Sequence, residues 1–290
     1  MHQEPGAKQI VVTGAFDDLR SQQVRFLEEA ARIGEVTVLL WADDLIRQVE
    51  GKEPGFPQAE RVYFLQAIRF VRRVLLVPKS AGHSPKTNLD LECVLLAARE
   101  GGVEPDLLVL SPAQDTAVSR AICQTGVIAC QVLRREALRG FPQGRPVPPV
   151  ADSGRKKVVV TGCYDWVHSG HVRFFEEASA YGDLYVIVGH DANLRLLKGP
   201  SHPFFPQAER RYVVGSIRYV TQALISTGEG WLDADPEIRR LKPDIYAVNE
   251  DGDKGGKREY CAKLGIEYLV LHRTPAPGLP PRTSTELRGY

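Results

Sequence analysis

The sequence lacks several features that would place it in a specialised class of protein. No apolar run approaches the roughly 20 residues of a membrane-spanning helix. The amino terminus has neither the basic start nor the apolar core of a signal peptide. Cysteine is scarce: five residues, odd in number, with no CxxC pair. This favours reduced thiols over a disulfide framework or a zinc site, and it predicts a cytoplasmic protein without a membrane span.

The sequence also lacks an excess of charge of either sign. Its formal net charge of +1 gives no electrostatic reason to expect nucleic acid as a partner. Hydrophobic residues make up 43% and charged residues 25% of the chain, as in ordinary globular proteins. With 290 residues, the chain is long enough for two domains, each with its own core.

The chain contains an internal repeat of domain size. Residues 9–40 align with residues 157–188 without a gap, and 14 of the 32 positions are identical. Chance would give about two identities on average residue usage. The hexapeptide FPQAER at 56–61 recurs at 205–210. These matches indicate a duplicated domain.

Each copy reads as strands alternating with helices, with four strands expected in the first copy and five in the second. Such alternation favours a parallel sheet flanked by helices. We therefore expect an α/β protein with two tandem Rossmann-like domains, residues 1–140 and 156–290. Four prolines within residues 141–149 predict a stiff linker over 141–155.

The clearest functional pattern follows the first strand of the second copy. Three valines at 158–160 suit a strand that is buried on both faces. His168 and His171 then bracket Gly170 at the start of an amphipathic helix. Glycine lets a ligand approach the backbone, free amides at a helix start attract anions, and imidazoles add donors. The pattern predicts a phosphate site.

The pattern TGxxDxxHxGH over residues 161–171 resembles the signature of the cytidylyltransferase-like nucleotidyltransferases. This family includes the glycerol-3-phosphate, choline-phosphate and ethanolamine-phosphate cytidylyltransferases. Three further family elements follow in order: Lys-Gly at 198–199, Glu-Arg at 209–210 and a Ser/Thr run at 283–285. The tandem arrangement resembles that of the ethanolamine-phosphate enzymes.

The resemblance implies that a phosphate oxygen of an acceptor attacks the α-phosphorus of a nucleoside triphosphate, and that pyrophosphate leaves. Catalysis then depends on positioning and charge neutralisation. The implied catalytic residues are His168, His171 and Lys198. The implied nucleotide-binding residues are Thr161, Gly162, Cys163, Tyr164, Gly170, Asn249, Asp251, Thr283, Ser284, Thr285 and Arg288. The implied acceptor-binding residues are Asp165, Arg195, Arg210 and Arg218. No protein ligand to a metal is expected, and Mg²⁺ would arrive with the nucleotide.

Several of these residues have structural alternatives. Lys198 could be a solvated loop lysine, and Arg210 could pair with a carboxylate for structural reasons. Arg218 could serve a subunit contact, because family dimers use the adjoining segment. The Ser/Thr run could simply cap a helix. Asn249 stands where the family often has glycine, so recognition of the base or the acceptor can differ.

The first copy lacks the groups that carry this chemistry. Arg20 and Gln23 stand at the positions of His168 and His171, and the Ser/Thr run has no counterpart. We therefore expect residues 1–140 to be non-catalytic. This copy either packs against the active copy as a pseudo-dimer or binds a regulatory nucleotide.

The sequence thus predicts a cytoplasmic nucleotidyltransferase that moves CMP from CTP to a small phosphorylated alcohol or sugar phosphate. Two alternatives stay open: an adenylyltransferase that uses ATP, and a nucleotide-binding regulator without turnover. The expected partners are the nucleotide and the phosphorylated acceptor, and homodimer formation is left open.

Overall fold

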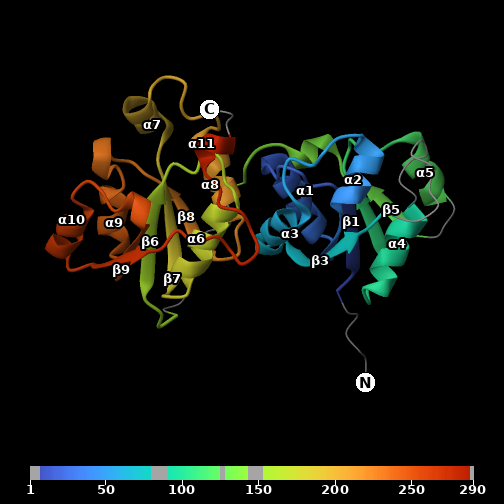
Figure 1. Cartoon of the computed structure of the whole chain (residues 1–290), viewed down its shortest axis with the longest axis horizontal. Helices are drawn as coiled ribbons and strands as arrows, with labels where there is room; N and C mark the ends of the chain where they lie inside the picture. Colours follow the sequence, from blue (N-terminus) through green and yellow to red (C-terminus); the bar gives the residue numbers. More distant parts are fainter. Residues whose placement is uncertain (1–6, 80–90, 125–127, 143–152, 288–290) are drawn as a thin grey trace. The chain divides into compact units, whose positions relative to one another are not determined.

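A computed structural model describes residues 7–79, 91–124, 128–142 and 153–287. The chain divides into two compact units, Met1–Gly140 and Phe141–Tyr290 (Figure 1). Residues 143–152, which form most of the expected linker, lie outside the described residues. None of the described helices is long and apolar enough to cross a membrane.

The first unit is a five-stranded sheet in the order β3-β2-β1-β4-β5, with every pair of neighbours parallel. Its elements are β1 (Gln9–Gly14), α1 (Ser21–Ala31), β2 (Glu35–Trp41), α2 (Asp43–Glu50), α3 (Gln58–Ala67), β3 (Val71–Val77), α4 (Leu91–Glu100), β4 (Leu107–Leu110), α5 (Ala117–Gln124), β5 (Ala129–Val132) and the 3₁₀ helix η1 (Arg135–Leu138).

The second unit repeats this topology in the order β10-β9-β6-β7-β8, again all parallel. Its elements are β6 (Lys157–Gly162), α6 (Ser169–Ser179), β7 (Asp183–Val188), α7 (Asp191–Lys198), α8 (Gln207–Gly215), β8 (Val220–Ile225), η2 (Gly230–Leu232), α9 (Asp235–Leu241), β9 (Ile245–Asn249), η3 (Glu250–Gly252), α10 (Lys257–Leu264), β10 (Glu267–Leu271) and α11 (Ser284–Leu287).

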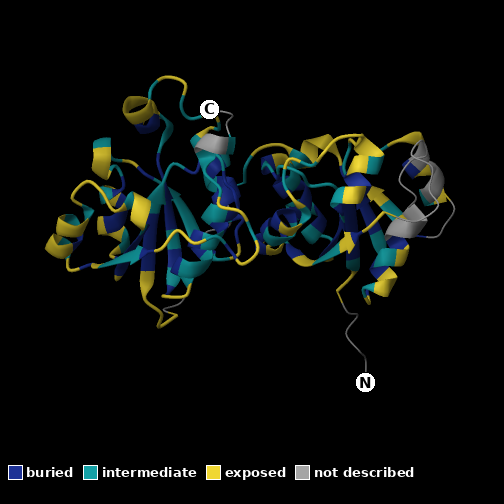
Figure 2. Cartoon of the chain, viewed as in Figure 1, coloured by how far each residue is buried: buried dark blue, intermediate teal, exposed yellow. Residues whose placement is uncertain are grey.

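The strand order places a switch point beside the first strand of each unit. From β6, the chain proceeds to β7 and β8 on one side and then crosses to β9 and β10 on the other. In open α/β sheets, ligands bind at the carboxyl ends of the strands where the direction of winding reverses. The apolar β6 is buried at 158–160, as its valines predict (Figure 2). The expected two-domain α/β fold is confirmed, and the switch point lies between β6 and β9.

Two α-helices and one strand were not expected from the sequence. The short helices α2 and α7 were not predicted, because each has only eight residues and leaves much of its surface exposed. The fifth strand of the first unit, β5, was also missed. Three of its four residues are exposed, so it lacks the apolar alternation that marks a strand. It is defined instead by its pairing with β4.

The repeated FPQAER segment makes a set of hydrogen bonds at the carboxyl edge of each sheet, which we call the clasp. In the second unit, Arg210 donates to the carbonyls of Phe205, Cys163 and Gly189 and to the Asp191 carboxylate, at 2.6–2.8 Å. The Gln207 side chain accepts the Asp191 amide at 2.9 Å. Arg210 is only 1% exposed. The clasp ties the turn after β6 to the starts of α7 and α8.

A carboxylate completes the clasp from the turn itself. Asp165 accepts the amides of Phe204 and Phe205, both at 3.0 Å. We use "clasp" for Asp165, Gln207 and Arg210 together.

The first unit builds the same clasp from Asp17, Gln58 and Arg61. Arg61 donates to three carbonyls and to the Asp43 carboxylate, and Asp17 accepts the amides of Gly55 and Phe56. The repeat therefore preserves an architectural device.

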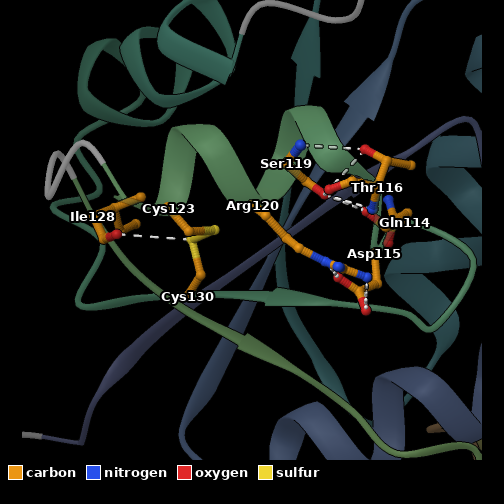
Figure 3. The surroundings of a disulfide bond; sticks show 8 residues. All are labelled: Gln114, Asp115, Thr116, Ser119, Arg120, Cys123, Ile128 and Cys130. Carbon is orange, nitrogen blue, oxygen red and sulfur yellow. Dashed lines mark hydrogen bonds and ion pairs between the residues drawn. A yellow bond between two sulfur atoms is a disulfide. The ribbon is translucent and has the colours of Figure 1, made fainter.

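A disulfide in the first unit corrects one expectation from the sequence. Cys123, near the end of α5, is bonded to Cys130 in β5, with a Cα–Cα separation of 5.6 Å (Figure 3). The prediction that all cysteines are reduced thiols is wrong for this pair. The spacing of seven residues matches no cysteine motif, and the fold brings the two together by turning α5 back into β5. Cys163 and Cys261 are free.

We expect this disulfide to stabilise the first unit measurably. Because β5 buries little apolar surface, the covalent link to α5 is a large part of its attachment. Closing so short a loop lowers the conformational entropy of the unfolded chain, which stabilises the folded unit by about 2–3 kcal/mol. Cys123→Ser should therefore lower the denaturation midpoint of this unit, and a reductant should reproduce the loss in the wild type. An unchanged midpoint, with Cys130 alkylated only in the variant, would contradict this prediction.

Candidate active site

His168 lies at the start of α6 and shapes its first turn. It is the N-cap residue, and its Nδ1 accepts the Gly170 amide at 3.1 Å. The side chain is almost fully buried, since the residue is 2% exposed. A neutral imidazole that accepts at Nδ1 carries its proton on Nε2. His168 is therefore held as an Nε2–H donor.

His171 lies one turn further along α6, against the same ring. The two imidazole centroids are 4.0 Å apart. The pKa of His171 is held well below its ordinary value by burial first, and then by the electrostatic influence of His168, Arg273 and Lys198. His171 is thus neutral at pH 7, and two cationic side chains lie near enough to influence it. The catalytic roles of His168, His171 and Lys198 stay predictions.

Gly170 is required by close packing between the two histidines. A Cβ at this position would lie 3.0 Å from the His168 ring and 3.3 Å from the Arg282 carbonyl oxygen. Any larger residue would push His168 or the segment before α11 outward. The glycine of the motif thus lets the carboxyl-terminal loop approach the start of α6.

A pocket of about 220 Å³ opens beside the start of α6. It lies between α6, the end of β9 and the loop that follows β10. Its lining includes Ser169, Gly170, Phe174, Asn249, Arg273 and Thr283. The Asn249 Oδ1 is buried and has no hydrogen-bond partner among the described residues. Three of the predicted nucleotide-binding residues, Gly170, Asn249 and Thr283, therefore line one cavity.

Arg273 is a site residue that the sequence reading missed. It follows β10, forms an ion pair with Asp251 and donates to the Arg282 carbonyl at 3.0 Å. It lines the pocket and lowers the pKa of His171. Its only sequence signal is its place directly after the last strand, at the carboxyl edge where ligands bind. Asp251, predicted to bind nucleotide, is engaged by this arginine.

The two cations predicted on the other side of the site belong to α7. Lys198 is its last residue and Arg195 lies one turn earlier, and both are exposed. Their side chains are not held by burial, which suits a mobile counter-charge for phosphates. Lys198 reaches His171 electrostatically.

The turn after β6 gathers the remaining predicted residues of this segment. The Thr161 hydroxyl is 2.7 Å from the Tyr246 hydroxyl. A Cβ on Gly162 would lie 2.8 Å from the Tyr164 ring, so that ring folds back over the glycine. Cys163 is a partly exposed free thiol whose carbonyl accepts from Arg210. Of these residues, Tyr164 contacts a catalytic candidate, since its ring centroid is 5.3 Å from that of His171.

Two acceptor assignments are corrected by burial. Arg210 spends its donors on the clasp and is 1% exposed, so it is not available to a bound acceptor. Asp165 is 2% exposed and holds two backbone amides. Both contacts recur in the first unit, which lacks the histidines. The structural alternative is therefore the correct one for Arg210, and it extends to Asp165.

A third acceptor assignment is corrected by strand direction. Arg218 precedes β8, whose first residue Val220 is in register with Leu184 and, through it, with Val158 at the start of β6. Arg218 therefore lies at the amino edge of the sheet, whereas the histidines lie at the carboxyl edge. A six-residue strand, about 20 Å long, separates the two edges.

The carboxyl-terminal Ser/Thr run is only partly described. The Ser284 hydroxyl donates to the Trp166 carbonyl at 3.4 Å, which places the start of α11 against the turn before α6. The Thr285 side chain and the whole of Arg288 lie outside the described residues. Their predicted contacts with phosphate stay predictions.

In the first unit, the equivalent crevice is bridged by a side chain. Gln114 donates to the Thr13 carbonyl at 2.7 Å and accepts the Ser111 amide at 3.0 Å. It thereby joins the ends of β1 and β4, where the second unit has its pocket. Arg20, at the position of His168, donates to Asp18 at 3.0 Å.

Metal ligands were not expected from the protein. Among the described residues, no group of three His, Cys, Asp or Glu side chains is arranged to hold a metal ion. Binding of Mg²⁺ through nucleotide phosphates stays a prediction.

Comparison with known proteins identifies the family of the second unit. Residues 159–281 match the model of the cytidylyltransferase-like family. The chain is 40% identical over 119 residues to an FAD synthase from Ferroglobus placidus, a match covering 40% of this chain and 74% of that protein. It is 44% identical over 104 residues to an FAD synthase from Pyrococcus horikoshii, covering 35% and 68% respectively.

A longer relative matches over a smaller share of its own length. The bifunctional protein HldE from Gluconobacter oxydans is 32% identical over 138 residues, covering 44% of this chain but 28% of that protein. The family match contains the paired histidines, the clasp and most of the residues that line the pocket. Through its second unit, the chain belongs to the cytidylyltransferase-like family of nucleotidyltransferases.

Proposed function

We propose that the second unit transfers a nucleotidyl group from a nucleoside triphosphate to a phosphate monoester, with release of pyrophosphate. The observation that carries this proposal is the pair of imidazoles in contact at the start of α6, at the switch point of the sheet. Lys198 and Arg273 add positive charge from two further elements. Phosphoryl chemistry needs such positioned donors and cations more than it needs a protein nucleophile.

The geometry assigns distinct tasks to these groups. An acceptor oxygen attacks the α-phosphorus, and the bond to the bridging oxygen of pyrophosphate breaks. His168 donates from Nε2 to a phosphate oxygen, because its Nδ1 is occupied by the Gly170 amide. Lys198 and Arg273 offset the charge that grows on the leaving group. Mg²⁺ bound to the triphosphate would add to that neutralisation.

We infer that the donor nucleotide is ATP. The two most similar relatives named above are FAD synthases, and FAD contains an AMP unit joined through a pyrophosphate link. The sequence resemblance by itself favoured CTP. Both nucleotides fit the same reaction, and the base is recognised by the pocket that includes Asn249 and Phe174.

We further infer that the acceptor carries a planar apolar group. Trp231 in η2 is 56% exposed, although it is the largest side-chain type. It packs on Gly255, where any Cβ would lie 1.8 Å from the indole nitrogen. The Lys257 ammonium is 5.7 Å from the ring centroid. η2 follows β8 and Gly255 follows β9, so this indole stands at the same edge of the sheet as the histidines.

An exposed indole beside a lysine suits an anionic aromatic ligand. Flavin mononucleotide, which is the precursor of FAD, combines a ring and a phosphate monoester and is the first acceptor to test. Small phosphorylated alcohols and sugar phosphates, favoured by the sequence alone, form the rest of the panel.

The test is pyrophosphate release by the full-length protein with Mg²⁺ and each pairing of ATP or CTP with these acceptors. ATP with flavin mononucleotide should give the highest kcat/KM and a product with the mass of FAD. Pyrophosphate release only with CTP would support a cytidylyltransferase and refute the inference that the donor is ATP. Tight nucleotide binding without release for any acceptor would favour the regulator and refute the proposed reaction.

A further inference from the structure

The turn after β6 and the adjoining strand β9 differ between the two units in a consistent way. Three residues there carry a hydroxyl or a thiol, whereas the first unit has apolar residues at the same positions. The pairs are Cys163 and Ala15, Tyr164 and Phe16, and Tyr246 and Leu108. The first unit shows that the fold forms without these polar groups.

Tyr164 is the most informative of the three. Its backbone is in the left-handed region, with φ of 51°, and Phe16 has the same conformation, with φ of 44°. The two rings therefore share one frame, and the difference is a hydroxyl. Tyr164 is 5% exposed, and no described residue hydrogen-bonds to its buried hydroxyl. Burying an unsatisfied hydroxyl costs stability, so the fold gains nothing from it.

The neighbour of this hydroxyl is the second histidine of the motif. The ring of Tyr164 meets the ring of His171 edge to face, with centroids 5.3 Å apart. The Nδ1 of His171 is also buried, and it too has no hydrogen-bond partner among the described residues. An unsatisfied donor and an unsatisfied acceptor thus lie on two rings in contact. Hydrogen bonds in active sites often tighten only when the ligand is bound.

We propose that in the nucleotide-bound enzyme the Tyr164 hydroxyl donates to Nδ1 of His171 and thereby keeps the His171 proton on Nε2, where it can donate to phosphate. This inference rests on the proposed function of the site. Tyr164 is then a positioning residue that acts through His171. Partners that fix the tautomer of a functional histidine are a general device.

The protonation states of the two groups suit this contact. Burial raises the pKa of Tyr164 well above its ordinary value, so the phenol stays protonated. Burial and the nearby cations lower the pKa of His171, so its ring is neutral and has one nitrogen free to accept. A neutral imidazole has only one N–H, so its tautomer decides which nitrogen faces the substrate as a donor.

Tyr164→Phe tests this inference by installing the residue of the first unit. We expect kcat to fall about tenfold or more, as for the loss of a positioned donor, with KM changed little. The denaturation midpoint should stay the same or rise, because an unsatisfied buried hydroxyl is removed. The matched control is Phe16→Tyr, which adds the hydroxyl to the same frame and should leave kcat unchanged. An unaltered kcat in Tyr164→Phe would overturn the inference.

The tautomer itself can be read by ¹⁵N NMR of histidine-labelled protein, with the His171 signals assigned through His171→Gln. With a non-hydrolysable ATP analogue or with tripolyphosphate, the wild type should show His171 as the Nε2–H tautomer. In Tyr164→Phe, part of this population should shift to Nδ1–H. An identical tautomer in both proteins would refute the contact.

These two readouts also separate this inference from the proposed function. The His171 tautomer could change in Tyr164→Phe although the wild type releases no pyrophosphate. That result would refute the proposed function and support the contact between Tyr164 and His171. If turnover is the same in Tyr164→Phe as in the wild type, the contact is refuted and the proposed function is not.

Discussion

Replacing His168 by alanine should lower turnover about 100-fold or more, the usual scale for removing a donor aimed at developing charge. Its Nε2–H is held toward the site because Nδ1 accepts the Gly170 amide, so alanine removes a preorganised group. Pyrophosphate release under saturating nucleotide and acceptor measures the loss. Turnover within a few-fold of the wild type would show that the chemistry happens elsewhere.

The control must separate chemistry from helix capping, since His168 also caps α6. Asparagine is a good N-cap residue but lacks an imidazole. His168→Asn should therefore recover the stability lost in His168→Ala without recovering turnover. In the first unit, Arg20→Ala with Gln23→Ala should leave turnover nearly unchanged. A large loss there in a folded protein would give that unit a part in catalysis.

Replacing Arg210 by leucine should destabilise the second unit by about 3–5 kcal/mol, the range for removing one partner of a buried ion pair. The leucine would leave the Asp191 carboxylate and three carbonyls without their donor. Arg210→Lys should recover only part of this, because one ammonium cannot reach four acceptors on separate segments. Hydrogen exchange read by mass spectrometry would locate the opening at the starts of α7 and α8.

Arg61→Leu offers a matched comparison within the same chain. It breaks the equivalent clasp of the first unit, with four equivalent contacts. Fast exchange should then appear around α2 and α3, while turnover by the second unit persists. If Arg210→Leu kept its stability but lost acceptor affinity, the structural role assigned to this arginine would be wrong.

The parts of this molecule that could be predicted from sequence are those encoded by local patterns. The three valines of β6 and the spacing of His168, Gly170 and His171 specify a strand, a turn and a helix start within fifteen residues. The duplication makes most of the α/β plan visible twice. For these features, the sequence neighbour is also the spatial neighbour.

The parts that could not be predicted depend on contacts between distant segments. An arginine after FPQAE can bind a phosphate or hold carbonyls, and only its burial decides. Arg218 was predicted to lie at the acceptor site but lies at the opposite edge of the sheet. Its position depends on the register of β8, which its neighbours in the sequence do not reveal. Arg273 likewise lies where loops from separate parts of the chain meet. The Cys123–Cys130 link is local, but its spacing of seven residues matches no cysteine motif that would have predicted it.

The clasp has a practical consequence for finding related enzymes in genomes. Because it recurs around a crevice that Gln114 bridges, FPQAER marks ancestry and not activity. A search profile weighted toward that hexapeptide would gather silent paralogues together with working enzymes. A profile that demands the paired histidines and the glycine between them would sort the two groups.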